Sequence, residues 1–386
     1  MEPNQRLMSL DALRGADMLF IMGFSQAIVA FCALLGAKEC WLAAQMKHVA
    51  WHGFHHHDTI FPLFLFLAGV SWPFSYAGQV SKGSSTAKMS LRILKRVLVL
   101  FFLGLATAEF FAFKVDNLRY DSVLAHIAVC WAAAAFLYMF VKNGKARLAI
   151  AAVLLLGHWL ILLSFTAPDA AALLASTDPA VAKKVAEYTA YGTDNFSFTG
   201  NIAGWIDRTF MPGHLYEFVF DPDGLLAKLT GTVTAILGTM AGELLRKRDL
   251  SGNRKTLILL GAAVVTLALT LAWKPWCPVN KKIWTSTFVL AAASYSFFVL
   301  ALFYWLIDVK GWRKWTFFFR VIGMNSITIY VMMRFVGFNT MSKFFFSGIA
   351  GLGNADWSRL VLLIGQVLIA WLVLLYLYRK NTFLKT

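Results

Sequence analysis

The chain has 386 residues, of which 59% are hydrophobic and only 15% charged, whereas ordinary soluble domains have about 25% charged residues. This composition excludes a soluble protein with a single core, because one core could not hide so much apolar surface, which includes 34 Phe side chains. The formal net charge of +16 comes from short Lys and Arg clusters between apolar runs, a pattern that indicates membrane orientation and argues against nucleic-acid binding.

Ten apolar runs are long enough to cross a bilayer, which takes about 20 residues, and they predict an all-α, polytopic membrane helix bundle. The predicted spans are 10–35, 58–79, 93–112, 121–141, 147–166, 224–245, 256–273, 284–306, 317–337 and 358–378. A polar segment at about 167–222 interrupts the series and is too short to fold independently. We therefore expect one membrane-embedded domain, 1–386, with an ordered insertion.

The basic clusters predict the orientation of the bundle. The richer clusters lie near 82–96, 142–147, 246–255 and 310–320, and at the two ends of the chain with Arg6 and Arg379. Because Lys and Arg collect in cytoplasmic loops, both termini are predicted to be cytoplasmic, and the 37–57 loop and the 167–222 segment to face outward. The four cysteines show no metal-type spacing and are predicted to be unpaired.

The densest polar stretch is MKHVAWHGFHHHDTIFP, residues 46–62. It contains five of the eight histidines, His48 among them, and ends with Asp58 at the start of the second span. Three interpretations are open: a general base assisted by a carboxylate, a zinc site with His and Asp ligands, and an interfacial anchor of His and Trp side chains. Adjacent histidines point in different directions, so the run 55–57 is a poor metal face.

Three further stretches carry polar groups beside or within apolar runs. In RLMSLDALRG (6–15), Asp11 and Arg14 share a helix face, where they either form an ion pair that anchors the cytoplasmic end of the span or place the arginine in a bundle cavity to bind phosphate. In PVNKKIWTS (278–286), Lys281 either snorkels or holds an anionic group. In GMNSITIY (323–330), Asn325 and Ser326 either bond between helices or contact a ligand. These features fit a secondary transporter about as well as an enzyme.

Taken in chain order, the motifs resemble the transmembrane acyltransferases typified by heparan-α-glucosaminide N-acetyltransferase, and the short bacterial members of that family most. The matching stretches are RLMSLDALRG (6–15), KHVAWHG (47–53), DTIFPLFLFLAGVS (58–71), AGWIDRTFMPGHLYEF (203–218), FDPDGLLAKLTGTVTAILGTMAGELLR (220–246), PVNKKIWTSTFVL (278–290), IDVKGWRKW (307–315) and GMNSITIYV (323–331). The resemblance also implies that this chain lacks the additional N-terminal luminal part, with its own span, that the family's lysosomal member carries.

The resemblance implies that His48 carries out acetyl transfer, as a general base or as a transient acetyl carrier, with Asp58 orienting it or capping the second span. Acetyl-CoA is the implied co-substrate, entering from the cytoplasmic side, and no metal is expected. Ser25 aligns with an Asn thought to assist catalysis, and either Ser25 or the adjacent Gln26 could donate to a developing oxyanion. The predicted donor-binding residues are Asp11, Arg14, Ser25, Asn280, Lys281, Trp284, Asn325 and Ser326.

The implied acceptor is an amino sugar or related glycan. Its predicted contacts are Trp51, Asp207, Arg208 and His214, although Asp207 and Arg208 would also make a local ion pair. The expected setting is the lipid bilayer of a bacterial inner membrane, and a homodimer is left open. The alternatives are a secondary transporter for a sugar or amino sugar, and an O-acetyltransferase of a cell-envelope glycan.

Overall fold

The computed structural model describes residues 7–108 and 118–384, and this part of the chain is helices and loops without a named strand. Arg6 and the last residues of the predicted 93–112 span lie outside the described residues. The first span is α1 (Met8–Leu19) and α2 (Ser25–Leu34), joined by a π-helical turn at Phe20–Phe24. That turn contains Gly23 at φ 122°, a conformation that favours glycine. The predicted all-α fold class is confirmed.

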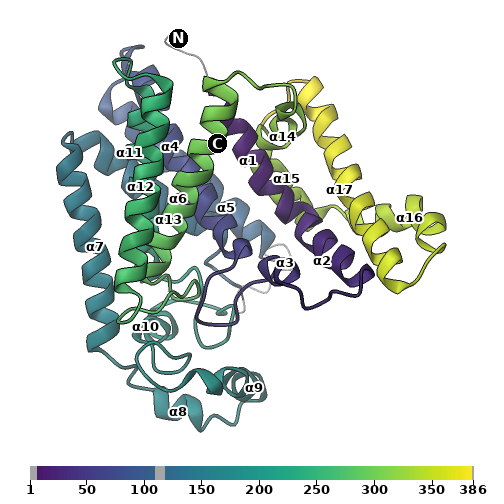
Figure 1. Ribbon diagram of the computed structural model, residues 1–386. Helices are drawn as coiled ribbons and strands as arrows, with labels where there is room; N and C mark the ends of the chain where they lie inside the picture. Colours follow the sequence, from purple (N-terminus) through teal and green to yellow (C-terminus); the bar gives the residue numbers. More distant parts are fainter. Residues whose placement is uncertain (1–6, 109–117, 385–386) are drawn as a thin grey trace.

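Eight long helices build the rest of the bundle (Figure 1). They are α4 (Ile60–Val80), α5 (Thr86–Thr107), α6 (Val123–Phe140), α7 (Gly144–Ser164), α11 (Ala227–Arg246), α12 (Gly252–Trp273), α13 (Ser286–Phe303) and α17 (Ala355–Arg379). The shorter α14 (Thr316–Gly323) and α15 (Ser326–Phe335) meet at a bend of 69°. The sequence did not predict α16 (Phe338–Ala350), which is too short to span and packs against α17, where Ser342 Oγ donates to Leu362 O.

Seven helices of the described chain are long and apolar enough to cross a membrane, or eight if α14 and α15 form one broken span. The chain is therefore an integral membrane protein by composition and helix length. Each of the ten predicted spans coincides with a helix or helix pair, but α5 and α11 are outside the seven. That all ten segments cross the membrane therefore stays a prediction.

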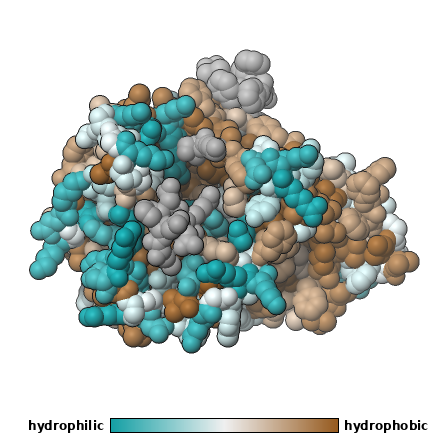
Figure 2. Space-filling model, turned by 90° about the horizontal axis from the view of Figure 1, so that it is seen from above, coloured by the Kyte–Doolittle hydropathy of each residue, from teal (hydrophilic) through white to brown (hydrophobic). Residues whose placement is uncertain are grey.

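Helix α1 (Met8–Leu19) begins and helix α17 (Ala355–Arg379) ends at the end of the bundle opposite the 167–222 segment (Figure 1). The loops after α4, α6 and α11 lie towards this same end (Figure 1). Seen from this end, hydrophilic residues cover much of the surface, and hydrophobic ones gather on the side of α16 and α17 (Figure 2). A chain whose first helix begins and whose last helix ends at the same end agrees with an even number of crossings. That this end is cytoplasmic stays a prediction.

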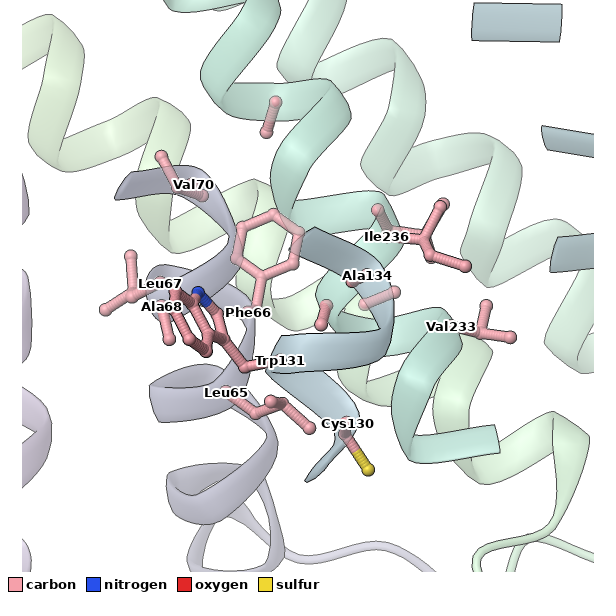
Figure 3. Close-up of a cluster of buried hydrophobic side chains, with 14 of the residues drawn as sticks. Leu65, Phe66, Leu67, Ala68, Val70, Cys130, Trp131, Ala134, Val233 and Ile236 are labelled. Carbon is pink, nitrogen blue, oxygen red and sulfur yellow. The ribbon is translucent and has the colours of Figure 1, made fainter. Parts of the chain in front are cut away.

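The largest core packs α4 against α11 and α6 (Figure 3). Glycines let the two backbones of α4 and α11 approach closely, because a Cβ at Gly238 would lie 2.2 Å from Phe66 O and one at Gly242 2.2 Å from Val70 O. Gly238 and Gly242 are four apart, which is the small-residue spacing typical of close helix pairs in membranes. This contact fixes α4, the helix that runs from the candidate site to the opposite end.

We expect Gly238→Ala to destabilise the protein by about 1–3 kcal/mol, because the added methyl group forces α4 and α11 apart. The measurement is thermal unfolding in detergent. The matched control is Gly261→Ala in α12, where a Cβ would meet nothing within 4 Å. That control should be neutral or slightly stabilising, since Ala is the better helix former. Equal unfolding temperatures for the two variants would contradict the close contact.

The 167–222 segment folds under the bundle and contains α8 (Ala170–Leu174), α9 (Pro179–Tyr188) and α10 (Ile202–Phe210). Its core includes Tyr188, Phe198 and Phe220, which pack around the ring of Trp51 from the 37–57 loop. The segment thereby holds the 37–57 loop in place beside the ends of α4 and α13.

Candidate active site

His48 and Asp58 form the central contact of the candidate site, with 2.7 Å between His48 Nδ1 and Asp58 Oδ1. The Asp58 side chain is only 2% exposed, whereas that of His48 is 52% exposed. Because a carboxylate only accepts, Nδ1 carries the proton in this pair and Nε2 is left as the basic nitrogen. A buried acid thus orients an imidazole whose other nitrogen can receive a proton from a bound molecule.

Backbone hydrogen bonds hold Asp58 in position. The N–H groups of His55 and Val49 donate to Asp58 Oδ2 at 3.1 and 3.4 Å, so the carboxylate closes the loop on itself. Asp58 therefore caps the short helical turn His56–Thr59 and binds His48 at the same time. The two roles that the sequence left open for this residue are compatible.

Lys281, from the loop between α12 and α13, completes the cluster. Its Nζ lies 3.1 Å from His48 Nδ1, 3.4 Å from His48 Nε2 and 3.7 Å from Asp58 Oδ1. Burial lowers the pKa of Lys281, and the nearby Asp58 opposes this effect. Asn280 shapes the lysine's loop by accepting from the N–H groups of Lys282 and Ile283. The loop is tied to the His48 loop where Gly53 N donates to Val279 O at 2.8 Å.

Ser25 reaches the same cluster through a different histidine. Its Oγ lies 3.1 Å from His57 Nδ1, and the His57 ring centroid is 4.5 Å from that of His48. Ser25 is buried at the start of α2, directly after the π-helical turn of the first span. The fold thus brings His48, Asp58, Lys281 and Ser25 together from three separate stretches of sequence.

The predicted acceptor residues have structural partners of their own. Trp51 is 1% exposed and its indole N–H donates to Phe196 O at 2.8 Å. Asp207 accepts from the backbone N–H groups of Leu225 and Asp221 at 2.9 and 3.2 Å, and burial raises its pKa to about 7.

Arg208 pairs with Asp169 through two hydrogen bonds of 2.6 and 2.9 Å, so its partner in the ion pair is Asp169 and not the adjacent Asp207. His214 is half-buried, with its ring 5.2 Å from that of Phe218. These two residues belong to the 167–222 segment and make no contact with the His48 cluster among the described interactions.

Other predicted donor residues are spread along the bundle. Trp284 has φ 45° and its ring stacks on His126 with centroids 4.7 Å apart. Asn325 and Ser326 lie at the break between α14 and α15, where Asn325 is buried and its Nδ2 has no hydrogen-bond partner among the described residues. These residues do not join the His48 cluster.

Arg14 lies near the opposite end of the bundle. It donates to Leu67 O at 3.3 Å and to Ser71 Oγ, and it pairs with Asp11 at 3.4 Å. Ser71 also lines a pocket of about 410 Å³. Arg14 thus adjoins the edge of that pocket, which the sequence did not reveal.

Arg92, Lys95 and Arg96 of α5 line this pocket, which we call the basic pocket. The Arg96 guanidinium lies 4.2 Å above the ring of Trp131, and Arg92 donates to Gln79 Oε1 at 2.6 Å. Three buried N–H groups facing this region have no partner among the described residues: Trp72 Nε1, Trp131 Nε1 and Arg96 Nε. Cationic side chains with unpaired donors favour an anionic ligand such as a phosphate. The sequence signal was the 82–96 basic cluster, which explained orientation alone.

Two cavities follow one face of α4. A small apolar cavity of about 30 Å³ borders Ile60 and Phe64, and the basic pocket extends from Ala68 to Gln79. Ile60, Phe64 and Ala68 are four residues apart and therefore share a face of the helix. At 1.5 Å per residue, the basic pocket begins about 15 Å from Asp58 and ends about 30 Å from it. Within 7–108 and 118–384, no group of three His, Cys, Asp or Glu side chains is placed to hold a metal ion.

These features define a class: a polytopic α-helical membrane protein with a His–carboxylate–Lys cluster at one end and a basic pocket towards the other. No protein-family model matches the chain. It is 27% identical over 368 residues to human heparan-alpha-glucosaminide N-acetyltransferase and 26% identical over 371 residues to the mouse protein of that name. The matches cover 84% and 86% of this chain. The chain is thus similar to these proteins over most of its own length, and it spans about half of theirs, 52% and 54%.

Proposed function

We propose that the chain is a membrane acetyltransferase that moves an acetyl group from acetyl-CoA to an amino sugar, with His48 as the general base. The main observation behind this proposal is the half-exposed imidazole of His48, whose Nδ1 lies 2.7 Å from Oδ1 of the buried Asp58. The two relatives are named as N-acetyltransferases of a glucosaminide, which supports the reaction class and the amino-sugar acceptor.

The basic pocket is the site we propose for the phosphates of the donor. Acetyl-CoA is a long molecule with phosphates at one end and the thioester at the other, and it enters from the side of the termini in this proposal. The length of α4 between the basic pocket and Asp58, about 15–30 Å, suits such an extended ligand. The apolar cavity beside Ile60 and Phe64 lies between the two ends. Arg14 supports the edge of the pocket through Ser71.

Direct transfer fits the cluster with few steps. The acceptor amine attacks the thioester carbonyl carbon and gives its proton to His48 Nε2, while Asp58 stabilises the imidazolium that forms. The C–S bond then breaks, and the leaving thiolate takes the proton back from His48. The hydroxyl of Ser25, which shares the cluster through His57, is the proposed donor to the oxyanion.

The test is acetyl transfer by the purified protein from labelled acetyl-CoA to a panel of amino sugars. We expect a labelled product with glucosamine, stable to mild alkali because it is an amide. An alkali-labile product would favour transfer to a hydroxyl group. Binding of acetyl-CoA without transfer to any acceptor would contradict the proposed acceptor class. Uptake of sugar into proteoliposomes without acetyl-CoA would favour a transporter. The proposed setting is a bacterial inner membrane.

A further inference from the structure

An apolar groove of about 820 Å³ runs between α12 and α13. Its sides include Val264, Leu267 and Leu271 of α12 and Phe298 of α13, and all four side chains are exposed at the surface of the bundle. Both helices are long and apolar enough to span a membrane. In a bilayer, the groove therefore opens sideways towards the lipid chains. A free sugar has no hydrocarbon group that could bind in such a groove.

One end of the groove is polar and adjoins the candidate active site. His52 and Lys274 line that end. His52 Nδ1 lies 3.4 Å from Asn280 Nδ2, and Asn280 directly precedes Lys281, whose ammonium contacts His48. The groove therefore has hydrocarbon surface along its length, and its polar end adjoins the His48 cluster through His52 and Asn280.

This arrangement matches an amphiphile with a polar head and an apolar chain. We propose that the physiological acceptor is an amino sugar that carries a hydrocarbon chain, with the chain in the α12–α13 groove and the sugar at His48. The inference rests on the proposed acetyltransferase function and names its substrate class. A molecule dissolved in the bilayer would reach the groove laterally, and its head would enter the cluster past His52.

The chain length of the acceptor tests the proposal. Glucosaminides with a methyl, butyl, hexyl or octyl group on the anomeric oxygen are compared below their micelle-forming concentrations, with purified protein and labelled acetyl-CoA. Each methylene that leaves water for the groove should raise kcat/KM by up to about fourfold. We expect at least a tenfold gain from methyl to octyl, mainly through KM, because the chain binds away from the reacting atoms.

A variant with a filled groove distinguishes binding of the chain in the groove from partition of the acceptor into detergent or lipid. Leu267→Trp places a larger side chain in the groove, whereas Leu269→Trp is the matched control on the same helix, also exposed but outside the groove. We expect Leu267→Trp to lose the chain-length gain and to acetylate free glucosamine at the wild-type rate, and Leu269→Trp to keep both. A gain that persists in Leu267→Trp would reflect partition into detergent or lipid and would overturn the groove. Equal rates for methyl and octyl acceptors in wild type would overturn it too, while the acetyltransferase function would stand. No transfer to any acceptor would refute the proposed function itself.

Discussion

Replacement of His48 by alanine is expected to lower the rate of acetyl transfer by about 10²- to 10⁴-fold, the usual contribution of a positioned general base. The reason is geometric: Asp58 Oδ1 is 2.7 Å from His48 Nδ1, so the other ring nitrogen, Nε2, is the one left to accept a proton on a side chain that is 52% exposed. Binding of acetyl-CoA should change little, because the proposed donor site lies along α4. The measurement is the single-turnover rate with labelled acetyl-CoA, combined with equilibrium binding of the donor.

His55→Ala is the matched control. His55 belongs to the same loop, but its Nδ1 contacts Lys47 O at 3.0 Å, on the exposed side. We expect this variant to stay within a few-fold of wild type. If His48→Ala kept its activity and His55→Ala lost it, the base would be misassigned. An acetyl group trapped on His48 after incubation with acetyl-CoA alone would replace direct transfer with a two-step route.

Substitution of the basic pocket is the second change with a large expected effect. We expect Arg92→Gln and Lys95→Gln each to weaken acetyl-CoA binding roughly tenfold, because each removes a charge-assisted contact to a phosphate. The loss should shrink as salt rises, since exposed charges are screened. The measurement is the dissociation constant for CoA at two ionic strengths, with the rate at saturating donor as a second readout.

Lys88→Gln is the control for this pocket. Lys88 is an exposed cation on the same helix, α5, but it does not line the pocket. Its substitution should leave CoA affinity within twofold of wild type. If all three variants bound CoA as tightly as wild type, the phosphates would lie elsewhere, for instance closer to the Asp11–Arg14 pair.

Two adjacent residues illustrate why residues that are neighbours in the sequence need not interact with each other in the structure. The sequence suggests a local ion pair between Asp207 and Arg208, but in α10 the two side chains have different partners. Arg208 reaches back to Asp169, whereas Asp207 accepts from the backbone of Leu225 and Asp221. Successive residues on a helix are about 100° apart, so an adjacent pair cannot face the same partner.

The sequence by itself determined the helical membrane class, the approximate positions of its apolar segments and the stretch that holds the histidines. Hydrophobic run length and charge clustering are local properties, so they can be read without the fold. The resemblance of the motifs also predicted His48 as the acetyl-transfer residue, and Asp58 lies only ten residues away.

Only the tertiary structure joined Lys281 to His48 across 233 positions and Ser25 to His57 across 32. It also separated Trp51 from the cluster by burying its ring against Tyr188. From the sequence, the basic residues of α5 predicted only the orientation of the bundle in the membrane. The packing of α4, α5 and α6 shows that these residues also line a pocket. Contacts of this kind depend on which helix faces meet, and those faces are set by close approaches such as that of Gly238 to Phe66, which no local pattern encodes.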